Sequence, residues 1–149
     1  MQQELERALT ILWGEPVRAI FSGRTDTGVS ARGQVVHVDL PAFRPPLSEP
    51  EIFDLLWRIN GIVVKELSVV SMVNAPENFH ARYSACEREY VYRILNRSQR
   101  SSLLKDTHYF VRQPLDLKAM SCAAQALLGE HDFGSFKSSN SDTSASICR

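Results

Sequence analysis

Few cysteines, no net charge and no long hydrophobic run characterise this sequence. Its three cysteines (Cys86, Cys122 and Cys148) are an odd number and lie far apart, which argues against a disulfide framework or a zinc-binding pattern. No apolar run approaches the roughly 20 residues that a membrane helix needs, and no charged-then-apolar leader opens the chain. We therefore expect a cytoplasmic protein with no membrane segment.

The charge balance and the spacing of the histidines further narrow the functions and binding sites to be expected. Seventeen basic and seventeen acidic side chains leave a formal net charge of zero, which argues against a strongly basic nucleic-acid coat. The length of 149 residues suits one domain with a real core. The histidines are scattered without ligand spacing, so we expect buried or hydrogen-bonded roles for most of them, and no metal. They are His37, His80, His108 and His131.

The first half of the chain predicts two helices and two strands. Apolar residues at helical spacing predict a helix that starts at the N-terminus and ends at Gly14. Strands are expected at residues 17–21 and 36–40, the second from its alternation of apolar and polar side chains. A capping box at Ser48 begins a second helix, which the pair at residues 60–61 is expected to close.

The second half predicts three strands and one helix. Strands are expected at residues 67–73, 85–95 and 108–111. The long middle strand would place Cys86, Arg88, Tyr90, Tyr92 and Ile94 on one face, because side chains alternate along a strand. Asp116 should cap a last helix that Gly129 ends.

The order of these elements predicts an α+β fold, with helices on one face of a mostly antiparallel sheet. Residues 138–146 are nearly all serine and other small polar residues, which is typical of a mobile loop. The chain opens in a helix with no strand before it and stops in this loop. We therefore expect a chain that is truncated at both ends.

The polar loop from Phe21 to Gln34 is the most informative stretch, because it combines Arg24, Asp26 and three glycines. The glycines let the backbone turn sharply and let another molecule approach closely. Arg24 lies two residues before Asp26 and can keep its carboxylate ionised by pairing with it. The alternative is an ordinary tight loop with a surface ion pair.

Residues 82–105 combine basic and aromatic side chains. Six basic residues stand there against two acidic ones, and three tyrosines lie in the same stretch. This mixture suits RNA, because phosphates need cations and bases stack on rings. The alternative is a solvated strand face. The residues concerned are Arg82, Arg88, Arg93, Arg97, Arg100 and Lys105, with Tyr83, Tyr90 and Tyr92.

Several blocks resemble the tRNA pseudouridine synthase A family. Residues 23–31 are similar to its signature loop, commonly Gly-Arg-Thr-Asp-Ala-Gly-Val-His-Ala, and residues 34–37 continue that pattern. Residues 79–82 resemble its Phe-His-Ala-Arg segment, and residues 88–92 its Arg-x-Tyr-x-Tyr strand. Residues 127–136 match the segment after the next helix. The blocks occur in the family's order across nearly the whole chain.

The resemblance implies an enzyme that isomerises uridine to pseudouridine in tRNA, on the 3′ side of the anticodon stem-loop. It implies the pseudouridine synthase fold, a homodimer whose basic cleft holds tRNA, and neither a metal nor an organic cofactor. Asp26 would be the nucleophilic carboxylate and Tyr90 the ring that stacks on the target base. Arg24 would pair with the aspartate and help to displace the target. For RNA binding we expect Arg32, Arg82 and Arg88.

The resemblance is incomplete. Thr27 replaces a common alanine and Ser30 a common histidine, from which we expect altered packing or RNA contact rather than lost chemistry. The family's first strand, with its Gly-Trp-Gln segment, and the elements after the serine-rich loop have no counterpart. Residues 1–84 would then be the N-terminal part of the catalytic fold, and residues 85–149 the start of its second half. We expect such a fragment to be inactive alone.

Two alternatives remain open. One is a truncated, catalytically inactive RNA-binding remnant of the same family, which would bind tRNA without changing its uridines. The other is a retroviral-type aspartic protease, because residues 26–28 spell Asp-Thr-Gly and a dimer would pair two carboxylates. Proteases of that type are all-β, so the three predicted helices argue against the second alternative.

Overall fold

The computed structural model describes residues 1–40, 46–136 and 147–148 of the chain. The chain divides into two compact units, an N-terminal unit of residues 1–89 and a C-terminal unit of residues 90–149. The serine-rich segment expected to form a mobile loop, residues 138–146, lies outside the described residues. The predicted halves, divided after residue 84, refer to a larger catalytic fold and stay a prediction.

The N-terminal unit opens with helix α1 (Gln2–Trp13), as the apolar spacing predicts. Its buried face consists of Leu5, Ala8 and Leu9. Gly14 ends the helix in the left-handed conformation (φ 76°), and its N–H donates to the Thr10 carbonyl at 2.8 Å. Glycine accepts this conformation without a steric penalty, so the expected end of the helix is confirmed.

Strands β1 (Ala19–Phe21) and β2 (Val36–Val38) form an antiparallel hairpin at two of the predicted positions. Ala19 lies opposite Val38 and Phe21 opposite Val36, so these four side chains share one face. All four contribute to the apolar core that the helices complete. The other face of the hairpin carries His37. For this sheet the helix-packed residues therefore lie on one face, as expected.

Helix α2 (Glu49–Ile62) begins with the predicted capping box, in which the Glu51 carboxylate accepts from the Ser48 N–H at 2.8 Å. It runs past the expected stop at residues 60–61. The Asn60 amide instead donates to the Leu56 carbonyl (3.0 Å) and the Val69 carbonyl (2.8 Å). Because that side chain bonds to the helix and to the chain after it, Asn60 is satisfied inside the last turn and does not end the helix.

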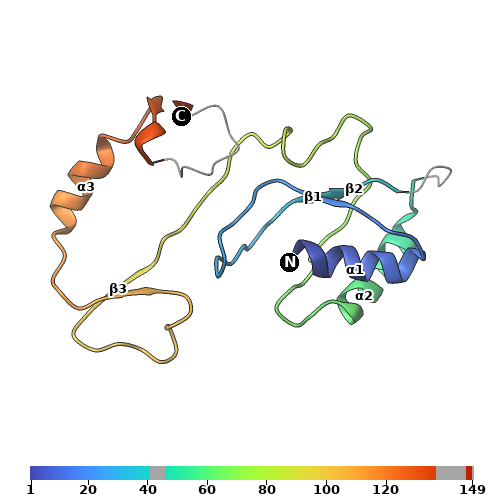
Figure 1. The fold of residues 1–149 in the computed structure, drawn as a ribbon, viewed down its shortest axis with the longest axis horizontal. Coiled ribbons are helices and arrows are strands. Elements are labelled where there is room, and N and C mark those ends of the chain that lie inside the picture. The colour runs from blue at the N-terminus through green and yellow to red at the C-terminus, as the bar shows by residue number, and fades with distance from the viewer. Residues whose placement is uncertain (41–45, 137–146, 149) are drawn as a thin grey trace. The chain divides into compact units, whose positions relative to one another are not determined.

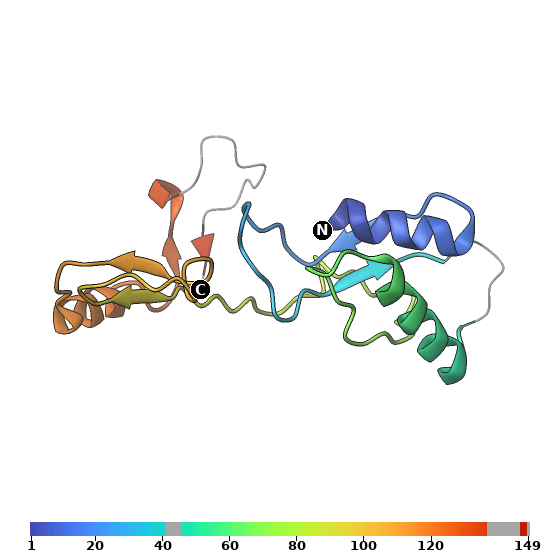
Figure 2. The same ribbon diagram turned by 90° about the horizontal axis from the view of Figure 1, so that it is seen from below.

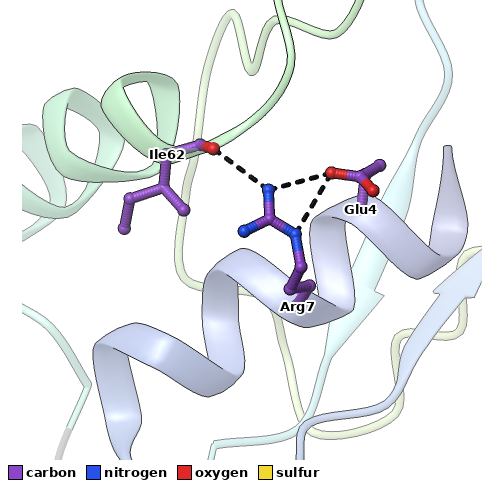
Figure 3. Close-up of polar contacts among 3 residues, drawn as sticks. All are labelled: Glu4, Arg7 and Ile62. Atoms are coloured by element: carbon purple, nitrogen blue, oxygen red, sulfur yellow. Dashed lines mark hydrogen bonds and ion pairs between the residues drawn. The ribbon is translucent and has the colours of Figure 1, made fainter.

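Helices α1 and α2 lie beside the hairpin and share its core (Figures 1 and 2). Ile59 is fully buried and Leu9 is 2% exposed. Arg7 also joins the helices, donating to the Ile62 carbonyl at 3.2 Å while pairing with Glu4 at 2.9 Å (Figure 3). Ile62 is the last residue of α2, and its carbonyl has no partner within the helix. Arg7 thus places a cation at the negative end of α2, whose last turn has no basic residue.

Side chains of α1 also bond to the backbone of β1. The Ala19 N–H donates to Glu6 at 3.0 Å, and its carbonyl accepts from the Gln2 amide at 3.1 Å. Gln2 donates to Glu6 as well, at 2.9 Å. Hydrogen bonds from Gln2 and from the Ala19 backbone, with the positive charge of Arg18, lower the pKa of the Glu6 carboxyl. Ionised Glu6 is therefore part of the contact between helix and strand.

The C-terminal unit contains strands β3 (Ile94–Asn96) and β4 (Tyr109–Val111), helix α3 (Leu117–Gln125), and strands β5 (His131–Asp132) and β6 (Ile147–Cys148). β3 and β4 are parallel, whereas β5 and β6 are antiparallel. Asp116 caps α3 as predicted, because its carboxylate accepts from Lys118 N–H at 3.0 Å and Ala119 N–H at 2.9 Å. The helix ends at Gln125, four residues before Gly129, and none of its side chains is buried.

One predicted strand is absent, and another is much shorter than expected. Residues 67–73 form no strand, and the expected strand at 85–95 is limited to the short β3. Strand-forming residues adopt that structure when a partner strand and a half-buried surface are available. No strand pairs with residues 67–73 or 85–93 among the described residues. The shared strand face expected for Arg88 and Tyr90 is therefore wrong too.

The fold combines three helices with three two-stranded sheets in the described part of the chain, which is compatible with the α+β class. The expected single, mostly antiparallel sheet is replaced by separate pairs, one of them parallel. Each strand spans two or three residues, so each pair leaves edges that side chains or water must satisfy. Within the described ranges, no helix is long and apolar enough to cross a membrane.

Replacing Glu6 with glutamine should destabilise the chain most at neutral pH. A lowered pKa in the folded state means that ionised Glu6 contributes stability above about pH 4.5, the ordinary glutamate value, and that this is lost as the pH falls through the lowered pKa. Glu6→Gln should cost about 1 kcal/mol at pH 7. Urea unfolding from pH 7 to pH 3 should show the two proteins converging in acid. A difference that is constant with pH would contradict this role, and Glu15→Gln, which removes an exposed charge, is the matched control.

Candidate active site

The loop between β1 and β2, residues 22–35, is anchored at its base by hydrogen bonds between its two ends. The Ser22 N–H donates to the Val35 carbonyl at 2.9 Å, which continues the hairpin one step beyond β1. The Ser22 hydroxyl donates to the Gln34 side-chain oxygen at 2.7 Å, and the Gln34 amide donates to the Gly23 carbonyl at 2.7 Å. The loop therefore leaves the hairpin from a fixed base.

Asp26 lies beyond that base at the first position of a tight turn. The Val29 N–H donates to the Asp26 carbonyl at 3.2 Å, and Gly28 takes a left-handed conformation (φ 88°). A positive φ at the third position of a turn requires glycine or a residue that tolerates the same conformation. The Asp26 side chain is exposed, so its carboxylate is accessible to a large substrate.

Arg24 and Arg32 lie on either side of Asp26 in the same loop, and both are exposed. They provide positive charge on an accessible surface, which suits a polyanionic ligand. The expected pairing of Arg24 with Asp26 stays a prediction.

A second segment, residues 80–84, packs against the face of the hairpin opposite the helices. Its Ala81 is 2% exposed, and the Ala81 N–H donates to the His37 Nδ1 atom of β2 at 3.0 Å. The His80 Nδ1 atom accepts from the N–H groups of Arg82 (3.2 Å) and Tyr83 (3.3 Å), as the side chain of a helix N-cap does. The His80 ring stacks on Tyr83, with centroids 4.3 Å apart, and lies 4.7 Å from His37.

Arg88 joins the two segments. Its guanidinium donates to the Ser22 carbonyl twice, from Nε at 3.2 Å and from Nη2 at 2.8 Å. Nη2 also donates to the Arg82 carbonyl at 3.1 Å. One side chain thus contacts the start of the Asp26 loop and the turn at residues 80–84.

Five of the six predicted site residues lie in the N-terminal unit. One of them, Arg88, donates hydrogen bonds both to the start of the Asp26 loop and to the carbonyl of another, Arg82. The sixth, Tyr90, is the first residue of the C-terminal unit and is 71% exposed. The residues in the N-terminal unit are Arg24, Asp26, Arg32, Arg82 and Arg88.

Gln34 and His37 also hold the site together, although neither was predicted as a site residue. The signal was present, because both lie in the block at residues 34–37 that continues the signature loop. The hydrogen-bonded role expected for most histidines is confirmed, since His37, His80, His108 and His131 all have hydrogen-bond partners. Within the described ranges, no three metal-ligand side chains come together.

Comparison with known proteins finds extensive similarity to enzymes named tRNA pseudouridine synthase A. The chain is 40% identical over 146 residues to the enzyme of Hydrogenovibrio crunogenus, a match that covers 97% of this chain and 53% of that protein. It is 44% identical over 138 residues to the enzyme of Caulobacter vibrioides (92% and 53%) and 43% identical over 141 residues to that of Halalkalibacterium halodurans (91% and 50%). The chain therefore spans about half the length of the curated relatives it matches. No protein-family model matches it.

Gly28 and Gly33 offer a matched pair of substitutions in the Asp26 loop. An alanine side chain would meet no atom within 4 Å at either position, but only Gly28 has a left-handed backbone. Gly28→Ala should therefore destabilise the turn by about 1–2 kcal/mol, whereas Gly33→Ala should change stability by less than about 0.5 kcal/mol. Thermal unfolding and the rate of tryptic cleavage in the loop measure both effects. Equal effects of the two substitutions would show that the turn at Asp26 does not depend on Gly28.

Proposed function

We propose a function from the premise that the chain belongs to the tRNA pseudouridine synthase A family. The whole protein isomerises uridine to pseudouridine in tRNA, on the 3′ side of the anticodon stem-loop, and this chain supplies the loop that carries the nucleophile. The observation that carries the proposal is the 40% identity over 97% of the chain with a protein of that name. Because the chain spans about half of such relatives, the activity, substrate and partners of the whole protein are part of the proposal.

The reaction breaks the bond between ribose C1′ and uracil N1 and forms a bond between C1′ and C5. The Asp26 carboxylate adds to the ribose or to the base, which splits one difficult step into two easier ones. The uracil then turns, C5 bonds to C1′ and loses its proton, and N1 gains a proton. The bond to Asp26 breaks in this second step, which regenerates the free carboxylate. Atoms and electrons balance without an oxidant or a reductant, so the reaction requires no redox cofactor.

The exposure of Asp26 supports this role, because the target is a nucleotide of a large RNA rather than a small molecule. A stacked base cannot reach a carboxylate, so the target must leave the helix at a cost of a few kcal/mol. Stacking on Tyr90 repays roughly 1–3 kcal/mol of that cost. We assign the displacement of the base and the pairing with Asp26 to Arg24.

The proposed partners follow from the same family membership. The substrate is tRNA, which the whole protein binds as a cytoplasmic homodimer. Exposed arginines of the N-terminal unit supply cations for its phosphates, and Arg32 and Arg82 carry this role.

Two other functions make different predictions. An aspartic protease of the retroviral type would be all-β, and the three helices argue against it. An inactive RNA-binding remnant would bind tRNA with an affinity that weakens steeply with salt but would leave the uridines unchanged. Tritium release by this chain from tRNA labelled at uridine C5 tests the remnant directly, because pseudouridine formation expels the C5 hydrogen whereas binding alone does not.

Asp26→Asn in the full-length protein should abolish tritium release from labelled tRNA. Asparagine has the shape of aspartate without its nucleophilic charge, so kcat should fall by roughly 10³-fold or more. The Kd for tRNA should stay within a factor of about three, because the exposed arginines that bind phosphate are unchanged. The wild-type protein assayed beside it is the control. Substantial turnover by the variant would exclude Asp26 as the nucleophile.

Tyr90→Phe should retain most of the activity, whereas Tyr90→Leu should lose it. Phenylalanine keeps the aromatic face, while leucine loses a stacking energy of roughly 1–3 kcal/mol, which corresponds to about 5- to 150-fold in kcat/KM. Single-turnover tritium release compares the two variants directly. If both behaved alike, the ring of Tyr90 would not stack on the target base.

A further inference from the structure

The side chain of Arg88 forms its hydrogen bonds with backbone atoms. Its three hydrogen bonds all go to carbonyl oxygens, two of them to Ser22 and one to Arg82. The Nε and Nη2 nitrogens that make these bonds form one fixed fork of the planar guanidinium. A lysine keeps the charge but cannot reproduce this fork.

The contact lies where the Asp26 loop begins. Ser22 follows β1 directly, and Asp26 comes four residues later. A Cβ atom added at Gly23 would lie 3.5 Å from Arg88 Nε, an ordinary van der Waals contact, so the guanidinium lies beside Gly23 as well as Ser22. Arg88 therefore restrains the position of the loop backbone by its hydrogen bonds to Ser22.

Gln34 restrains the neighbouring peptide from the other end of the loop. It donates to the Gly23 carbonyl at 2.7 Å and accepts from the Ser22 hydroxyl at 2.7 Å. Two consecutive carbonyls, those of Ser22 and Gly23, are thus each held by a side chain distant in sequence. Gln34 carries no charge, so it can hold the loop without contributing a cation to RNA binding.

We propose that Arg88 is a positioning residue for Asp26, which fixes the start of its loop through the Ser22 carbonyl together with Gln34. The proposal rests on the function proposed above and assigns Arg88 a role other than the phosphate contact expected from the sequence. A carboxylate that must meet one atom of an extruded nucleotide depends on such a restraint, because a misplacement of about 1 Å costs roughly 10²-fold in rate.

Arg88→Lys and Arg88→Gln in the full-length protein separate positioning from phosphate binding. If Arg88 positions Asp26, both variants lower kcat by roughly 10- to 100-fold, with the Kd for tRNA and its salt dependence nearly unchanged for Arg88→Lys. If Arg88 binds phosphate, Arg88→Lys retains wild-type kcat, and Arg88→Gln weakens tRNA binding and reduces the slope of log K against log[salt] by roughly 0.7–0.9. The kcat of Arg88→Lys distinguishes the two roles, and a wild-type kcat would overturn the proposal.

Two further variants test the same restraint. Gln34→Met keeps the length of the side chain but removes both of its hydrogen bonds, so it should lower kcat without changing the salt dependence of binding. Arg58→Lys is the matched control, because Arg58 lies on α2 and pairs with Asp54 at 3.6 Å, away from the loop. It should leave kcat unchanged. An effect of Arg58→Lys equal to that of Arg88→Lys would also overturn the proposal.

Limited proteolysis of this chain tests the restraint independently of catalysis. Trypsin can cleave after Arg24 and Arg32, both exposed in the loop. Loss of the Arg88 contact should raise the initial cleavage rate at these two bonds by roughly 10-fold, because local opening limits proteolysis. Unchanged cleavage in Arg88→Lys would overturn the restraint, whereas an inactive wild-type enzyme would contradict only the proposed function.

Discussion

The structure depends on how backbone N–H and carbonyl groups outside the strand pairs find hydrogen-bond partners. In the described part of the chain each strand spans two or three residues, so most of the extended backbone there has no ladder partner. Amide side chains fill that role, because each offers an NH2 group that can donate two hydrogen bonds and a carbonyl oxygen that accepts. Asn74 bonds to both the N–H (3.1 Å) and the carbonyl (2.7 Å) of Leu47, and Asn60 does the same for Val69. Asn96 accepts from the Leu115 N–H and donates to the Val111 and Gln113 carbonyls. The same device anchors the Asp26 loop, where Gln34 bonds to Gly23 and to Ser22.

This constraint explains how much of the fold could be predicted from the sequence. Helices α1 and α2 were predictable because their signals are local: an apolar stripe, a capping box and a glycine that accepts a positive φ. Strands depend on partners distant in sequence, and the segment at residues 67–73 bonds to the side chain of Asn60 instead of to a strand. Alternating hydrophobicity indicates an extended chain with two faces, but it does not identify what lies beside that chain. The end of α2 expected at residues 60–61 was wrong for a related reason. Asn60 bonds to Val69 in the chain that follows α2, and the helix continues to Ile62.

The sequence could indicate which side chains are chemically suited to the candidate site, but not which residues hold them in place. The position of Asp26 between glycines and near arginines was sufficient to select its carboxylate as a candidate, and the structure places it on an exposed turn. Gln34 lies in a block that continues the signature loop, but the sequence does not indicate which backbone groups Gln34 and Arg88 bond to, because hydrogen bonds to backbone carbonyls follow no periodic pattern. Arg88 illustrates the difference: in the sequence it is one cation of a basic stretch, whereas in the structure it bonds to two carbonyls that lie 66 and 6 residues away.

The two departures from the family's signature loop can be interpreted in the same terms. Thr27 and Ser30 are exposed, and neither side chain takes part in the bonds that hold the ends of the loop. Those bonds come from Ser22, Gln34 and Arg88, which lie outside the stretch that differs. Thr27 occupies the second position of the turn closed by Asp26 and Val29. The glycine that the turn does require, Gly28, is present. The departures therefore alter the exposed surface of the loop, while the backbone around Asp26 keeps all of its described restraints.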